Sequence, residues 1–114
     1  MGNPNVAVFV DDPADVDLAA LAAASAALAG PANVVAVARS APVELTVRVH
    51  ERGVGETQAC GTGSCAAVAA ALARGDVTGD TVRVRLRGGT LEVRPQGARY
   101  ELAGPAEYVF QGER

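Results

Sequence analysis

The stretch "ERGVGETQACGTGSCAAVAAALARG", Glu51–Gly75, changes character at Cys60. Charged residues and glycines precede this cysteine, and an alanine-rich run from about Thr62 to Arg74 follows it. A helix that is apolar on all sides is typically buried. The run therefore predicts a central helix around which the other elements pack, and its small side chains would let them approach closely.

The chain before this stretch predicts a strand, a helix and two more strands. The first strand is Val6–Val10, and the helix covers roughly residues 14–29, where leucines recur at helical spacing. The segment "NVVAVA", residues 33–38, is the second strand. In "VELTVRVHERG", which begins at Val43, apolar and polar residues alternate, as in a strand with one face in water.

Four short strands are predicted over "TVRVRLRGGTLEVRPQGARYELAGPAEYVFQGE", residues 81–113. Turns at Gly88-Gly89, Gln96-Gly97 and Gly104-Pro105 separate them. A length of 114 residues suits a single domain over residues 1–114. The order of elements predicts the α+β class, with antiparallel strands curved around the buried helix and the second helix outside.

Composition and charge exclude two classes of partner. The net charge is −3, and the ten basic residues, all arginine, are dispersed without aromatic neighbours, so we expect no nucleic acid. We find no run of 18 apolar residues and no signal peptide, so we expect no membrane association and a cytoplasmic location. Alanine and valine supply most of the apolar mass and bury little area each, which favours stabilisation by a partner surface.

Cys60 is the candidate catalytic residue. The partial positive charge at a helix N-terminus lowers the pKa of a nearby thiol and favours the thiolate. Because Gly61 and Gly63 lack a Cβ, the N–H groups of residues 61–64 would form an anion site. A thiol beside a carboxylate pocket suits proton abstraction at the α-carbon of an amino or hydroxy acid, and equally a nucleophile. The alternative is that Cys60 is a small buried core residue.

The segment "ERGVGETQACGTGSCAA", residues 51–67, closely resembles the C-terminal signature of the diaminopimelate epimerases. Three other segments are similar to that family but less specific: "GNPNVAVFVDD", "ANVVAV" and "GPAEYVFQGE". The resemblance implies the epimerase fold, in which two similar halves are related by a pseudo-twofold axis. This chain resembles the C-terminal half.

The resemblance also implies an activity, the interconversion of LL- and meso-diaminopimelate in lysine biosynthesis. The family uses no pyridoxal phosphate, and we expect neither a cofactor nor a metal. Two cysteines face opposite sides of the substrate α-carbon, and one takes a proton while the other donates one. Cys60 matches the catalytic cysteine of the C-terminal half, and Gly61 and Thr62 match the positions that bind the α-carboxylate.

Four more residues match substrate-binding positions of the family. Glu51 and Arg52 match the pair that reads the distal amino-acid end, and Asn3 and Asn33 match two binding asparagines. Each has a plainer interpretation. The charged pair suits a solvated strand end, and Asn33 suits the start of a strand.

Several other polar residues are more simply structural. We interpret Cys65 as core packing and His50 as a surface residue of an alternating strand. Glu56 suits the cap of the following turn. Arg83, Arg85 and Arg87 suit the solvated face of an edge strand.

Two departures from the family pattern bear on activity. Asn5 stands where the family has a histidine, so a group that titrates near neutral pH is replaced by one that does not. The family enzyme is also about twice as long, and its N-terminal half carries a Cys-Gly-Asn-Gly motif that this chain lacks. Cys65 cannot replace that cysteine, because it lies about one and a half turns along the same helix.

These departures indicate an excised, redesigned or reconstructed half. We expect a twofold homodimer, in which a second copy takes the place of the missing half and the two Cys60 thiols face one pocket. A catalytically silent structural domain is the alternative. A broader relationship to proline racemases or phenazine-type isomerases is disfavoured by the Glu51-Arg52 pair.

Overall fold

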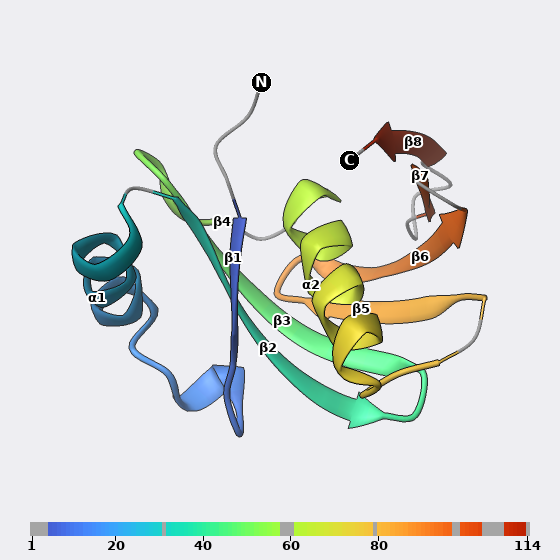
Figure 1. Cartoon of the computed structure of the whole chain (residues 1–114), viewed down its shortest axis with the longest axis horizontal. Helices are drawn as coiled ribbons and strands as arrows, with labels where there is room; N and C mark the ends of the chain where they lie inside the picture. Colours follow the sequence, from blue (N-terminus) through green and yellow to red (C-terminus); the bar gives the residue numbers. More distant parts are fainter. Residues whose placement is uncertain are drawn as a thin grey trace.

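The alanine-rich run forms helix α2 (Gly61–Arg74), which lies on the concave side of one curved sheet (Figure 1). The computed structural model describes residues 5–30, 32–57, 61–78, 80–96, 99–103 and 109–113. The predicted turn at Gly104-Pro105 lies outside these residues, as does Gly97 of the preceding turn. No helix in the described ranges is long and apolar enough to cross a membrane.

The remaining elements follow the predicted order, with a 3-10 turn (η1) and one short strand (β4) added. They are β1 (Asn5–Phe9), η1 (Pro13–Asp15), α1 (Leu18–Ala29), β2 (Asn33–Ala41), β3 (Glu44–Glu51), β4 (Gly55–Thr57), β5 (Val82–Leu86), β6 (Gly89–Gln96), β7 (Arg99–Ala103) and β8 (Val109–Glu113).

The strands form one sheet in the order β1-β2-β3-β5-β6-β7-β8, with β4 paired to β3. The α+β class is confirmed, but the sheet is mixed where an antiparallel one was predicted. Strands β1 and β2 run parallel, and so do β3 and β5. Each of these pairs is joined through a helix, α1 or α2, and such a crossover returns the chain in its original direction. The other pairings are antiparallel.

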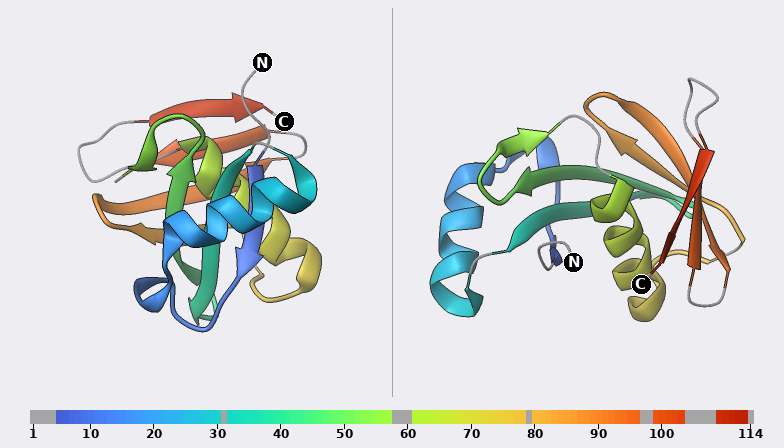
Figure 2. Two further views of the ribbon diagram at one scale, coloured as in Figure 1. Left: turned by 90° about the vertical axis from the view of Figure 1, so that its left-hand side faces the viewer. Right: turned by 90° about the horizontal axis from the view of Figure 1, so that it is seen from above.

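The core lies between α2 and the concave face of the sheet (Figure 2). It includes Cys65, Ala67, Val68 and Ala71 of the helix, which pack with valines of β2, β3, β5 and β6 and with Leu45. The core prediction for Cys65 is thus confirmed, since its exposure is 2%. Small helix residues bring the strands close on several sides, as the sequence predicts.

Helix α1 lies on the outer side of the sheet, where it contacts β2 and β3 (Figures 1 and 2). It begins at Leu18 rather than near residue 14, because Val16 is extended and Asp17 forms the N-cap. The Asp17 carboxylate accepts a hydrogen bond from the Ala20 N–H at 3.1 Å. Helices α1 and α2 therefore cover opposite faces, and the first five residues of β2 are buried on both sides.

The arginines of β5 confirm one prediction and correct another. Arg83 and Arg85 are exposed, as predicted, but β5 is an interior strand between β3 and β6 rather than an edge strand. Both guanidinium groups pair with Glu44 of β3, at 3.8 and 3.5 Å. The alternating pattern identifies the wet face but not the neighbours of the strand, because those depend on the crossover through α2.

Candidate active site

The first turn of α2 contains Gly61 and Thr62, as predicted for the start of the buried helix. Cys60 precedes Gly61 in the chain. Cys60 and Asn3 lie outside the described residues, so the roles given to their side chains stay predictions. A helix N-terminus carries a partial positive charge, which suits both a thiolate and a carboxylate.

Asn33 connects three segments at the start of β2. Its side chain is buried, with 6% of the residue exposed. Its Oδ1 accepts a hydrogen bond from the Arg52 backbone N–H at 2.9 Å, and its Nδ2 donates to Asn5 Oδ1 at 3.3 Å. The structure thus brings Asn33 and Arg52 together, and adds Asn5, the position at which the family histidine is replaced.

Glu51 and Arg52 lie where β3 ends and the hairpin to β4 begins. Gly53 and Gly55 have φ of 81° and 105°, a region that favours glycine, and so permit this tight turn. A cavity of about 270 Å³ lies between the turn and α1, and is lined by His50, Arg52, Gly53 and alanines. His50 is half-buried there, so its predicted surface position is only partly matched.

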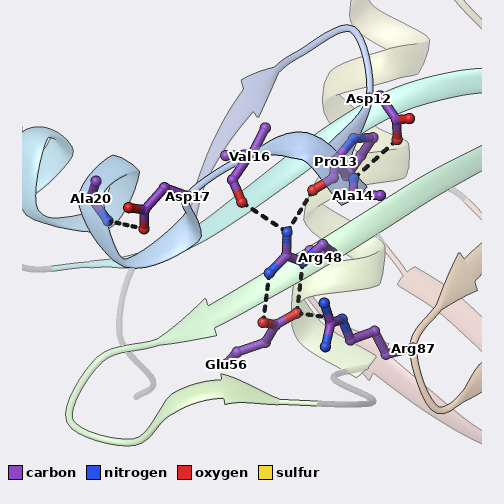
Figure 3. A network of polar contacts seen from close by, with 9 residues as sticks. All are labelled: Asp12, Pro13, Ala14, Val16, Asp17, Ala20, Arg48, Glu56 and Arg87. Atoms are coloured by element: carbon purple, nitrogen blue, oxygen red, sulfur yellow. Dashed lines mark hydrogen bonds and ion pairs between the residues drawn. The ribbon is translucent and has the colours of Figure 1, made fainter.

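Arg48 forms a polar cluster beside this hairpin, and sequence reasoning did not single it out (Figure 3). Its Nε and Nη2 donate to the two carboxylate oxygens of Glu56 at 2.8 and 2.7 Å. Its Nη1 donates to the carbonyl oxygens of Pro13 and Val16 at 2.6 and 2.9 Å. Arg87 adds a second cation at 3.1 Å from Glu56.

This cluster replaces the predicted turn-cap role of Glu56. The pairing becomes visible only once the hairpin register is known, in which Glu56 lies opposite His50. Arg48 then stands two residues along β3, on the same face of the sheet, within reach of the Glu56 carboxylate.

The hydrogen bonds from Arg48 lower the pKa of the Glu56 carboxyl, and the positive charges of Arg48, Arg87 and His50 act in the same direction against the effect of burial. A carboxyl with a lowered pKa in the folded state stabilises the fold above its unfolded pKa of about 4.3, and this stabilisation is lost as the pH falls through the lower folded value.

We therefore expect the free energy of unfolding to fall as the pH is lowered below about 4.3, partly through Glu56. Urea unfolding at pH 5 and pH 3 measures this change. Glu56→Gln cannot titrate, so it should lose less stability than the unsubstituted chain over the same interval. An equal loss in both proteins would contradict the assignment.

Asn33→Ala is expected to reduce the free energy of unfolding by about 1–3 kcal/mol, because the partly buried Arg52 N–H and the Asn5 carboxamide each lose a partner. Urea unfolding measures it. Ser40→Ala is the matched control, since Ser40 is an exposed polar residue of the same strand. Equal stability of the two variants would show that the Asn33 contacts contribute nothing.

Comparison with known proteins assigns the family. The sequence profile described as "Diaminopimelate epimerase" matches residues 1–109. The chain belongs to the diaminopimelate epimerase family. Diaminopimelate epimerases from Pelotomaculum thermopropionicum and Xanthomonas campestris are 43% and 45% identical to it, over 125 and 118 aligned positions. Each alignment covers 99% of this chain but 41% of the relative, so the chain spans well under half the length of these relatives.

Solved structures support the epimerase-like fold. A PhzF-family phenazine biosynthesis protein from Enterococcus faecalis matches with a TM-score of 0.70 and 16% identity, over 89% of this chain and 37% of that one. A PhzC/PhzF protein from Clostridium difficile, described as putative, matches with a TM-score of 0.66 and 22% identity, also over 89% of this chain and 37% of that one. At these identities the similarity concerns the fold alone.

Proposed function

We propose that this chain provides the C-terminal catalytic half of a diaminopimelate epimerase, with Cys60 as one of its two proton-transferring thiols. The observation that carries the proposal is the position of Cys60 in a member of this family, directly before the buried helix α2. The substrate is the small amino acid diaminopimelate, and a biosynthetic role is consistent with a cytoplasmic location.

In the proposed reaction, the Cys60 thiolate removes the α-proton of the substrate. The C–H bond breaks, its electron pair stays on the α-carbon, and an S–H bond forms. A second thiol on the opposite face then donates its proton to that carbon and becomes a thiolate. Gly61 and Thr62 would bind the α-carboxylate at the positive end of α2, which also stabilises the developing negative charge. Neither step needs a cofactor.

The second thiol must come from outside this copy of residues 1–114. The only other cysteine, Cys65, is 2% exposed and packs in the core. We propose that the second thiol is Cys60 of a second copy in a twofold dimer, because a twofold axis presents the same group from both sides. A half like the N-terminal half of the longer relatives would serve the same purpose.

Glu51, Arg52, Asn3 and Asn33 complete the proposed substrate site. Arg52 lies directly after β3, and its role in reading the distal end of the substrate rests on the match to the family. Asn33 favours a second candidate function, a silent half-domain that binds at most a small carboxylate. Its Oδ1 and Nδ2 both form hydrogen bonds with protein groups, which is the arrangement expected of a residue with a purely structural role.

Incubation of the chain with diaminopimelate in D₂O distinguishes these functions. The epimerase proposal predicts deuterium at the substrate α-carbon, at a rate per chain that rises with protein concentration as dimers form. NMR spectroscopy of the substrate measures the exchange. No exchange at concentrations where sedimentation shows a complete dimer would contradict the proposal and favour the silent half-domain.

A further inference from the structure

Arg48 connects three segments that are separate in the chain. It belongs to β3, its carboxylate partner Glu56 belongs to β4, and its carbonyl partners Pro13 and Val16 bracket the η1 turn that leads into α1. The Arg48 and Glu56 side chains are only 12% and 25% exposed. In Figure 3 the guanidinium lies between the η1 segment on one side and Glu56 on the other.

Strand β4 is short and is held in the sheet by a single neighbouring strand. It is three residues long and, among the described residues, pairs with β3 through Val49↔Thr57, His50↔Glu56 and Glu51↔Gly55, while helix α1 also contacts it. An isolated two-stranded hairpin is marginal in water. The Glu56 carboxylate anchors the middle of β4 to Arg48 of β3 and, at 3.1 Å, to Arg87 after β5.

The position of β4 bears on the candidate site at both of its ends. Before β4, Glu51 ends β3 and pairs with Gly55, and Arg52 begins the turn. After β4 ends at Thr57, only residues 58–60 separate it from Gly61, where α2 begins. Cys60 is thus three residues from the end of β4 and directly before α2 in the chain, so only a short covalent path separates it from β4.

We propose that Arg48 and Glu56 are positioning residues of the active site. Their paired hydrogen bonds hold the β3–β4 hairpin against the sheet and the η1 turn, and thereby fix Glu51 and Arg52 before the hairpin and Cys60 after it. Neither residue needs to contact substrate. The role in catalysis rests on the proposed function of Cys60, whereas the role in holding the hairpin does not.

Hydrogen exchange of the full chain at pH 7 tests the first part. Arg48→Met and Glu56→Gln should speed amide exchange over residues 50–57 by about tenfold or more, while amides of 66–72 in α2 exchange as before. Arg48→Lys keeps the positive charge but lacks the planar guanidinium group, so its exchange rate should lie between those of the unsubstituted chain and Arg48→Met. Glu44→Gln is the matched control, because it removes two ion pairs on the same strand away from the hairpin. Equal exchange in all variants would overturn the inference.

Alkylation of Cys60 by iodoacetamide as a function of pH tests the second part, with the modified peptide identified by mass spectrometry. If Cys60 is displaced from the start of α2, its thiolate loses stabilisation by the helix. The pH midpoint of alkylation should therefore rise in Arg48→Met and Glu56→Gln but not in Glu44→Gln, and in Arg48→Lys it should rise less. A loosened hairpin with an unchanged profile would overturn the link to Cys60. Absence of deuterium exchange at the substrate α-carbon in the complete dimer of the unsubstituted chain would instead overturn the proposed function, with the hairpin result still standing.

Discussion

Cys60→Ala is expected to lower deuterium incorporation at the α-carbon of diaminopimelate by about 10³-fold, the usual effect of removing a positioned acid–base group. The reason is chemical, since alanine can neither accept nor donate the proton. The substitution removes one sulfur atom directly before α2 in the chain and leaves in place Gly61 and Thr62, the residues proposed to bind the carboxylate. NMR spectroscopy in D₂O measures the rate.

Cys65→Ala is the matched control for Cys60→Ala. Cys65 lies on the same helix and is buried in the core, so its loss should reduce stability and leave the exchange rate of the folded protein within a few-fold. Exchange in Cys60→Ala at more than about a tenth of the unsubstituted rate would contradict the assignment of Cys60 as the base.

Arg48→Met is expected to lower the free energy of unfolding by about 2–3 kcal/mol. Methionine keeps the apolar contacts of the stem but leaves the Glu56 carboxylate and the carbonyls of Pro13 and Val16 without these donors. The Arg48 side chain is 12% exposed and its bonds to the two carbonyls are partly buried, so the loss exceeds that of an exposed ion pair. Urea unfolding at pH 7 and one fixed protein concentration measures it.

Glu44→Gln provides the comparison for Arg48→Met. Glu44 pairs with Arg83 and Arg85, whose side chains are more than half exposed, and such pairs contribute about 0–1 kcal/mol. The urea concentration at the midpoint of unfolding should therefore be clearly lower for Arg48→Met than for Glu44→Gln. If Arg48→Met is as stable as Glu44→Gln, the hydrogen bonds of Arg48 do not support the fold as argued.

The elements of the fold follow from local patterns in the sequence, and the strand directions do not follow from alternation alone. The alanine run predicts α2 because a helix that is apolar on all sides is typically buried, and in the structure residues 63–68 and Ala71 of this helix are buried. The strand–helix–strand order over Asn5–Ala41 is a signal for a parallel pair. The strong alternation of β5 and β6 favours antiparallel pairing, and applying it to the whole chain gave the wrong direction at β1 and β5.

Part of the candidate site can likewise be predicted from the sequence, and part depends on the three-dimensional structure. The resemblance of the segment around Cys60 to the epimerase signature predicts site roles for Gly61, Thr62, Glu51 and Arg52, and these roles stay predictions. The contact of Asn33 with Asn5 and the Arg52 N–H depends on the parallel register of β1 and β2 and on the turn after β3. The Arg48–Glu56 pair likewise depends on the register of a three-residue strand, which no periodicity in the sequence reveals.

The central claim, that Cys60 works opposite Cys60 of a second copy, is tested most directly by mixing chains. Equal amounts of the unsubstituted chain and Cys60→Ala are unfolded together, refolded at constant total concentration, and assayed for conversion of LL- into meso-diaminopimelate. With random pairing, only about a quarter of the dimers hold two Cys60 thiols. We therefore expect about a quarter of the rate that the unsubstituted chain alone shows at the same total concentration. A rate of about half, in proportion to the unsubstituted chain present, would contradict it.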